Sequence, residues 1–133
     1  MNTFIVDLKN KPSELARLTE AIAQKGIDIT AFSGSTCGDS ATLALVTNDE
    51  AGTQRVLTDG QWTFRTVEAI AASVPNRPGA LAELARKLGK AGVNIEAAFP
   101  TGMTGGNVQI VFATDNPKKA REALGELVGA TSR

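Results

Sequence analysis

The stretch that decides the fold is Asn10-Lys11-Pro12-Ser13-Glu14-Leu15-Ala16-Arg17-Leu18, which recurs 66 residues later as Asn76-Arg77-Pro78-Gly79-Ala80-Leu81-Ala82-Glu83-Leu84. A second pair of segments keeps the same offset: Lys25-Gly26-Ile27-Asp28-Ile29 and Ala91-Gly92-Val93-Asn94-Ile95. The offset also relates residues 45–49 to residues 111–115. Chance similarity rarely holds one offset across separate segments, so the sequence predicts a tandem repeat of one unit.

The apolar periodicity of the first copy switches between strand and helix patterns. Alternation over residues 3–8 predicts a strand. Pro12 suits the first turn of a helix, because that position needs no N–H donor. The helix then carries an apolar stripe of Leu15, Leu18 and Ile22. The elements that follow are strands at residues 27–32, 41–47 and 62–66 and a helix at residues 49–57.

The second copy repeats this pattern. Its expected elements are strands at residues 70–74, 93–99 and 108–112, a helix with the stripe Leu81, Leu84 and Leu88, and a last helix opened by Asp115 and Pro117. Each copy therefore follows the order β-α-β-β-α-β, which is the ferredoxin-like arrangement. We expect an α+β protein of two such units, at residues 1–67 and 68–133, with antiparallel sheets and helices on one face.

The end of the second copy departs from the repeat. The last helix runs to about Leu127, and only Val128-Gly129-Ala130-Thr131-Ser132-Arg133 follow it. This segment is short and weakly apolar, so the last strand is either missing or replaced by pairing from another segment. Proteins usually cover an open sheet edge. A partner chain is the simplest cover, so we expect a homodimer.

The composition excludes several classes of protein. The chain has 14 basic and 14 acidic residues and a net charge of zero, whereas nucleic-acid binding needs a clustered positive field. A single cysteine excludes an internal disulfide and agrees with a reducing compartment. The N-terminus lacks the pattern of a signal peptide, and no apolar run reaches the roughly 20 residues of a membrane span. We expect a cytoplasmic protein that binds neither nucleic acid nor membrane.

The residues available for chemistry argue against catalysis. The chain has no histidine, the side chain that most often performs acid–base work near neutral pH. Cys37 therefore lacks the usual base that would activate a thiol. No paired carboxylates and no metal-ligand cluster stand at a useful spacing. We expect a protein that is not an enzyme, with no catalytic residue, metal or cofactor.

The two helix-opening segments are the candidate binding sites. A helix N-terminus presents unpaired backbone N–H groups and a partial positive charge, which suit a carboxylate. Gly79 would let a ligand approach the backbone closely, and the amide of Asn76 could bind an ammonium or a carboxylate. The alternative is plain helix capping, which a duplication would copy equally well.

The ordered set of motifs resembles the ACT domain. It comprises Asn-Arg-Pro-Gly-x-Leu from Asn76, a helix, and Ala-Gly-Val-Asn-Ile ending at Ile95, each with a counterpart in the first copy. The whole chain is similar to small stand-alone tandem ACT proteins over roughly residues 3–127. The resemblance implies a ferredoxin-like fold, units that pair edge to edge, and amino acids bound between units. The ligand then contacts the strand-to-helix loop of one unit and the second strand of its neighbour.

Carried over position by position, the resemblance implies a ligand site in the second copy and a loop in the first copy that is a weaker site or purely structural. The matching residues are Asn76, Arg77, Pro78, Gly79, Ala80 and Leu81 in the second loop, Asn94 and Ile95 at the start of the second strand, and Asn10 and Pro12 in the first loop. In the first copy Ser13 replaces the glycine and Glu14 places a negative charge in the first turn. We therefore expect the loop of the second copy to be the better carboxylate site.

Two functions remain open after the enzyme is set aside. The first is a regulatory protein that senses a free amino acid at the interface between ACT units and acts on an enzyme or a regulator. The second is a ligand-free module for protein interaction or oligomerisation, since a fold by itself does not establish a working site. The sequence identifies neither the amino acid nor whether the site lies within or between chains.

Overall fold

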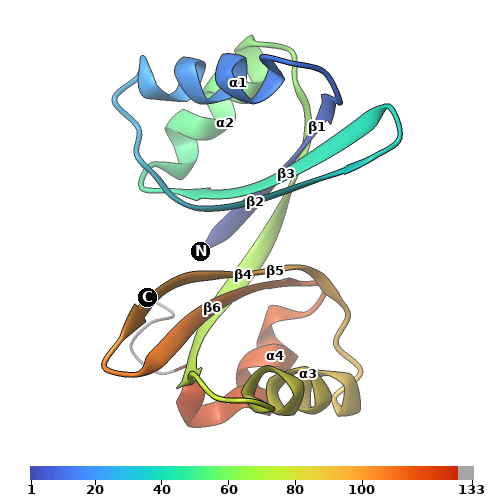
Figure 1. Cartoon of the computed structure of the whole chain (residues 1–133), viewed down its shortest axis with the longest axis vertical. Helices are drawn as coiled ribbons and strands as arrows, with labels where there is room; N and C mark the ends of the chain where they lie inside the picture. Colours follow the sequence, from blue (N-terminus) through green and yellow to red (C-terminus); the bar gives the residue numbers. More distant parts are fainter. Residues whose placement is uncertain (129–133) are drawn as a thin grey trace. The chain divides into compact units, whose positions relative to one another are not determined.

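The computed structural model describes residues 1–128 of the chain. The chain divides into two compact units. One, here the N-terminal unit, is Thr3–Thr66; the other, here the C-terminal unit, joins Met1–Asn2 to Val67–Arg133. The fold is α+β with two tandem ferredoxin-like units, as the sequence predicts (Figure 1).

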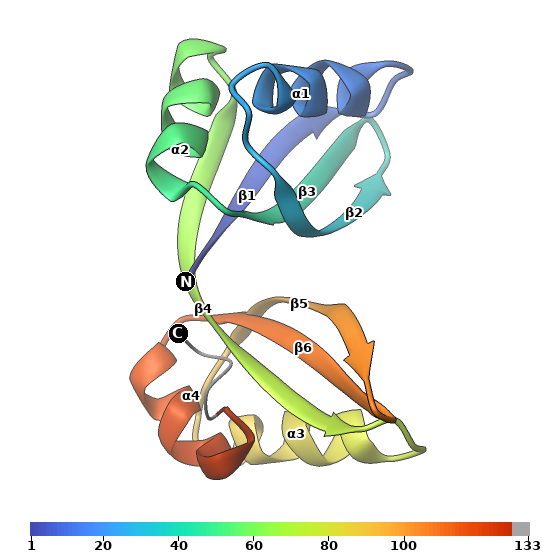
Figure 2. The same cartoon turned by 90° about the vertical axis from the view of Figure 1, so that its left-hand side faces the viewer.

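The N-terminal unit contains all the elements of a ferredoxin-like unit. They are β1 (Asn2–Lys9), α1 (Glu14–Ala23), β2 (Ile29–Cys37), β3 (Ser40–Thr47), α2 (Glu50–Asp59) and the first part of β4 (Thr63–Pro75). The strand order is β2-β3-β1-β4, and both β1 and β2 pair antiparallel with β3. Figure 2 shows both helices on one face of this sheet.

The C-terminal unit repeats the arrangement with the rest of the chain. It contains the remainder of β4, then α3 (Ala80–Lys90), β5 (Ile95–Thr104), β6 (Asn107–Thr114), α4 (Pro117–Leu124) and the short 3₁₀ helix η1 (Gly125–Leu127). The strand order is β4-β6-β5, and both β4 and β5 pair antiparallel with β6. Here too the helices lie on one face (Figure 2).

The segment between the two copies is one continuous strand. The sequence predicts separate strands at residues 62–66 and 70–74, but β4 runs without a break over Thr63–Pro75. Val67, Glu68 and Ala69 contain no glycine or proline that would interrupt an extended chain. The last strand of the first copy is therefore also the first strand of the second.

The first residue of the chain is bonded to the middle of β4. The backbone carbonyl of Met1 accepts a hydrogen bond of 2.7 Å from the N–H of Ala69. The first residue of the chain is thus bonded to β4 at that point. Val128 is buried in the core of the unit, and residues 129–133 lie outside the described residues, so the expectation that the last strand is missing or replaced stays a prediction.

Each unit has its own apolar core between its sheet and its helices. Leu18 and Ile22 are fully buried in the N-terminal unit, as are Leu84 and Leu88 in the C-terminal unit. The helical stripes predict these four residues correctly. They are wrong for Leu15 and Leu81, which are 50% and 55% exposed. These two leucines stand in the first turns of α1 and α3 but not on the buried face of the helix, which in α3 carries Ala80, Leu84 and Leu88.

The repeat changes its offset by one residue in the last third of the chain. In β1 and β3 Phe4 pairs with Leu45, whereas in β4 and β6 Ile70 pairs with Phe112. The register between β5 and β6 shifts between Pro100 and Gly102, so Thr101 is an extra residue in a bulge. The match of residues 45–49 to residues 111–115 is therefore wrong by one residue.

Two kinds of hydrogen bond that occur in both units confirm the corrected offset. The side chain of Asn48 accepts from the N–H of Asp28, and Asp115 accepts in the same way from Asn94, both at 2.9 Å. The next residue caps the following helix in each unit: Asp49 accepts from Gly52, and Asn116 from Lys119. The last helix is thus capped by Asn116 and not by Asp115, with Pro117 at its first position as expected.

Candidate ligand-binding site

The loops that open α1 and α3 share one backbone conformation. Ser13 and Gly79 precede the two helices with φ 75° and φ 87°. The helices begin one residue later, so the expectation that Pro12 stands in the first turn of α1 is wrong. A left-handed residue suits glycine and is strained for serine. A Cβ placed on Gly79 would meet no atom within 4 Å, so conformation and not crowding explains this glycine.

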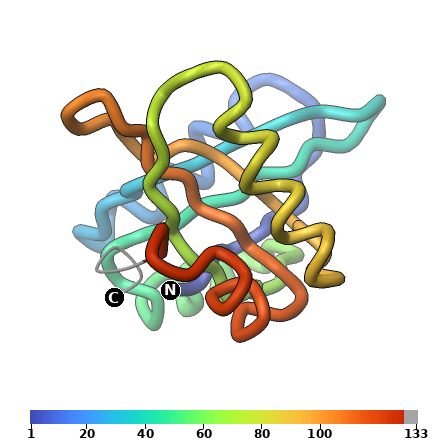
Figure 3. Tube along the Cα trace, turned by 90° about the horizontal axis from the view of Figure 1, so that it is seen from below, coloured from blue at the N-terminus to red at the C-terminus, as the bar shows by residue number. Residues whose placement is uncertain are grey.

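Both loops are bonded to the hairpin of their own unit. The backbone N–H of Asn10 donates to the carbonyl of Asp39 at 2.9 Å, and that of Asn76 to Gly106 at 2.8 Å. Figure 3 shows the second loop, in yellow-green, between the end of β4 and α3. The matched bonds fix the same loop shape twice.

The side chains of the two asparagines differ. The amide of Asn10 donates to the carbonyl of Gly38 at 2.9 Å. The amide of Asn76 has no hydrogen-bond partner among residues 1–128, and Asn76 is exposed. The amide of Asn10 is therefore engaged in holding its loop, whereas the amide of Asn76 is unengaged within the described residues.

A pocket lies beside each loop, against the second and third strands of its unit. The N-terminal pocket has a volume of about 490 Å³, and the C-terminal pocket about 290 Å³. The polar and charged residues that line the N-terminal pocket are Lys9, Asn10, Lys11, Glu14, Ser35, Thr36 and Thr42. Among the described residues, the polar or charged side chains that line the C-terminal pocket are Asn76 and Arg77. The rest of its lining is apolar: Val74, Pro75, Ala80, Leu81, Ala98, Phe99, Pro100, Val108 and Ile110.

The charges around the two pockets also differ. Glu14 lines the N-terminal pocket and pairs with Arg17 at 3.5 Å. The equivalent residue of the C-terminal pocket is Ala80, and no acidic side chain lines that pocket within the described chain. Arg77 supplies its cation and also pairs with Glu83 at 3.3 Å. The N-terminal pocket also holds Lys9 and Lys11, so the two linings have the same net charge and differ in that only the N-terminal one contains a carboxylate, at Glu14.

The structure brings together only some of the residues expected at the site. Asn76, Arg77, Ala80 and Leu81 line the C-terminal pocket, and Asn10 lines the N-terminal one. The expected residues that line neither pocket are Pro12, Pro78, Gly79, Asn94 and Ile95. Within its own unit, Asn94 is engaged elsewhere, because its amide donates to Glu96 at 2.6 Å.

The strand walls of the pockets are missing from the sequence-based set. Phe32 on β2 and Ala98 on β5 occupy equivalent places in the two pockets, and Phe32 is 62% exposed. The repeat relates these two positions. A phenylalanine in the second predicted strand was the signal that the sequence offered for this wall of the pocket. The loop motif alone carries no information about which strand faces it.

Residues 1–128 contain neither a metal-binding cluster nor a membrane-spanning helix. Among residues 1–128, no three His, Cys, Asp or Glu side chains gather in a way that could hold a metal ion. No helix in that part of the chain is both long and apolar enough to cross a membrane.

Comparisons with known proteins find relatives of the same fold. Protein BT0572 from Bacteroides thetaiotaomicron superimposes with a TM-score of 0.80 and 26% sequence identity, covering 94% of this chain and 86% of that chain. The regulatory subunit of aspartate kinase from Thermus thermophilus, in a ligand-free form, gives a TM-score of 0.65 at 13% identity, covering 95% and 91%. The alpha and beta subunits of an aspartokinase give 0.68 at 17% identity, with coverages of 95% and 91%.

A comparison with curated proteins found no match. A family model described as an ACT domain pair matches residues 1–127. This model accounts for both ferredoxin-like units and for both helix-opening loops. The chain therefore belongs to the ACT domain pair family.

Proposed function

We propose that this protein is a regulatory protein that binds a free amino acid beside the loop that opens α3. The observation that carries the proposal is the contrast between the two loops. Asn76 presents an unengaged amide next to Arg77 at an open pocket, while Asn10 is bonded within its own loop. The relatives support the regulatory role, because one is a regulatory subunit of aspartate kinase.

The chemistry of the C-terminal pocket suits such a ligand. Arg77 and the amide of Asn76 can bind a carboxylate, since guanidinium and amide groups are donors of suitable geometry. Leu81 and Ala98 offer apolar surface for the ligand's side chain. The volume of about 290 Å³ is close to the lower bound of about 300 Å³ typical of small-molecule sites.

The proposal includes a neighbouring ACT unit that completes the site. In that arrangement the ligand lies between units and contacts the second strand of the neighbour, at Asn94 and Ile95. A homodimer in the cytoplasm would supply the neighbour, and ligand binding would change the packing of the units. An enzyme or a regulator would respond to this change.

The alternative is a protein-interaction module that binds no ligand. The exposed large apolar side chains favour it: Leu15, Phe32, Leu81 and Met103. Exposed apolar residues of this size often mark protein contacts when they gather in a patch. Amino acids would then leave the protein unchanged, and only a protein partner would cover these side chains.

Thermal melting against each of the twenty amino acids tests the proposal. A ligand at ten times its dissociation constant adds about 1.4 kcal/mol of stability, which is a shift of several degrees for a domain of this size. We expect Asn76→Ala to reduce the shift and the matched control Asn10→Ala to leave it. If no amino acid shifts the melting temperature at millimolar concentration, the interaction module is the better interpretation.

A further inference from the structure

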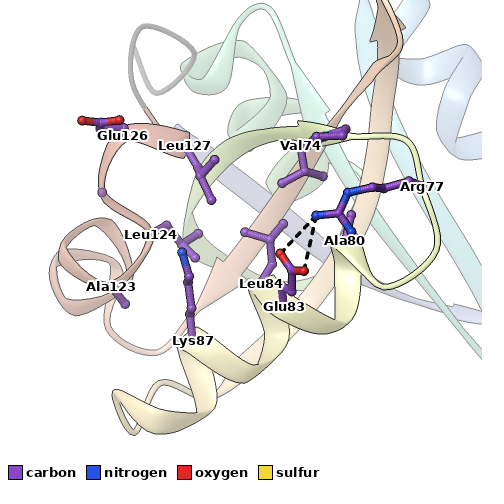
Figure 4. A pocket seen from close by; sticks show the side chains of 12 residues that line it. Val74, Arg77, Ala80, Glu83, Leu84, Lys87, Ala123, Leu124, Glu126 and Leu127 are labelled. Atoms are coloured by element: carbon purple, nitrogen blue, oxygen red, sulfur yellow. Dashed lines mark hydrogen bonds and ion pairs between the residues drawn. The ribbon is translucent and has the colours of Figure 1, made fainter.

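The polar groups of the C-terminal pocket come from one loop. Asn76 and Arg77 are neighbours in the loop that opens α3, and they supply the polar and charged lining within residues 1–128. Figure 4, which looks into a neighbouring hollow between α3 and α4, shows the Arg77 guanidinium paired with Glu83. Glu83 itself does not line the C-terminal pocket. A bound carboxylate therefore has donors at the loop, and the rest of the ligand lies against the other residues of the lining.

The wall opposite the loop presents apolar side chains that are open to contact. Leu81 comes from α3, Ala98 and Pro100 come from β5, and Val108 comes from β6. The first three are exposed and Val108 is partly buried, so a ligand in the pocket can contact all four. Apolar atoms of the ligand would remove this surface from water, which is favourable in proportion to the area covered.

The repeat explains why this wall has no hydroxyl group among the described residues. Three hydroxyl side chains line the N-terminal pocket: Ser35, Thr36 and Thr42. Strand pairing beyond the bulge gives their counterparts in the C-terminal unit: Gly102, Met103 and Gln109. The hydroxyl of the extra residue Thr101 donates to the side-chain oxygen of Gln109 at 3.2 Å, so these two polar groups bond to each other. Neither of them lines the C-terminal pocket.

We propose that the C-terminal pocket selects amino acids with an apolar side chain and rejects those whose side chain is charged or forms hydrogen bonds. The inference rests on the proposed function and adds the class of ligand. A polar side chain placed against Leu81, Pro100 and Val108 loses its hydrogen bonds to water and gains none from this wall. An apolar side chain of the same shape carries no such cost, so it binds more tightly.

Pairs of amino acids with the same shape and different polarity test the selection. The probes are valine against threonine and leucine against asparagine, each titrated into the full chain by calorimetry. We expect the apolar member of each pair to bind about tenfold more tightly than its polar partner, because the polar group is left without a hydrogen bond. Equal affinities within both pairs, or tighter binding of the polar members, overturn the inference.

The two exposed leucines provide a variant and its matched control. Leu81 and Leu15 are equivalent by the repeat and are 55% and 50% exposed, so neither substitution removes a core side chain. Leu81→Asn places an amide on the wall and should lower the preference for leucine over asparagine about tenfold. Leu15→Asn should leave the preference unchanged. If only Leu15→Asn alters the preference, the ligand binds in the N-terminal pocket and the inference is wrong.

This inference and the proposed function fail in different ways. If no amino acid binds, the proposed function fails and the selection fails with it. If threonine and asparagine bind more tightly than their apolar partners, and Asn76→Ala weakens that binding, the proposed function stands and only the selection is wrong.

Discussion

The loops that open α1 and α3 share one backbone conformation but differ in their side chains. Ser13 and Gly79 share a positive φ, and both loops are bonded to the hairpin of their unit. Around this shared frame, Asn10 and Glu14 are engaged by Gly38 and Arg17, whereas their counterparts in the C-terminal unit are an open amide and an alanine. The difference teaches that the two copies keep the same backbone constraints while the side-chain partners around them differ.

Substitutions in the two matching cores should have the largest effect on stability. Leu18→Ala and Leu84→Ala each remove a fully buried side chain, so each should lower the free energy of unfolding by about 2–5 kcal/mol. Chemical denaturation measures both. Similar losses support two equivalent cores. A loss below 1 kcal/mol in only one variant would break the equivalence of the two units.

The second-largest expected effect concerns a buried threonine hydroxyl that is hydrogen-bonded in one unit and not in the other. Thr47 shares a 2.7 Å hydrogen bond with Thr53, whereas Thr114, its counterpart, has a buried hydroxyl without a partner in the described chain, because Ala120 replaces Thr53. Thr47→Val should cost about 1–2 kcal/mol, and Thr114→Val should be neutral or stabilising by about 1 kcal/mol. Denaturation curves decide, and a stabilising Thr47→Val would contradict this account.

The left-handed residues give a smaller effect of opposite sign in the two loops. Ser13→Gly should relieve strain and raise the free energy of unfolding by about 0.5–1 kcal/mol, offset in part by the entropy that glycine adds to the unfolded chain. Gly79→Ala should lower it by about 1 kcal/mol, although its Cβ meets open space. Melting temperatures report both. If Gly79→Ala proves neutral, backbone conformation does not explain the glycine.

The exposed leucines give the smallest effect on stability. Leu15→Ser and Leu81→Ser change surface side chains, so the free energy of unfolding should stay within about 0.5 kcal/mol of the wild-type value. The two variants should differ in ligand binding. Leu81→Ser should weaken the binding of the amino acid that shifts the melting temperature, and Leu15→Ser should leave that binding unchanged. The reverse ranking would assign the ligand to the N-terminal pocket.

The repeat, the order of elements and the family could be predicted from the sequence, because they depend on local signals. Apolar spacing identified Leu18 and Leu84 as core residues, and Asp49 was correctly expected to open α2. The same signals failed where contacts are non-local. Leu15 and Leu81 share the spacing of the buried leucines but lie outside the contact with the sheet. The extra residue Thr101 is visible only through strand pairing.

By itself, the sequence determined two ferredoxin-like units and the loops that open α1 and α3, since periodicity and turn residues act over a few neighbouring positions. The tertiary structure decided what each position meets. It joined two predicted strands into β4, bonded Met1 to β4 at Ala69, and engaged Asn10 while leaving Asn76 open. These outcomes depend on pairing and packing between distant segments, whose partners no local pattern specifies.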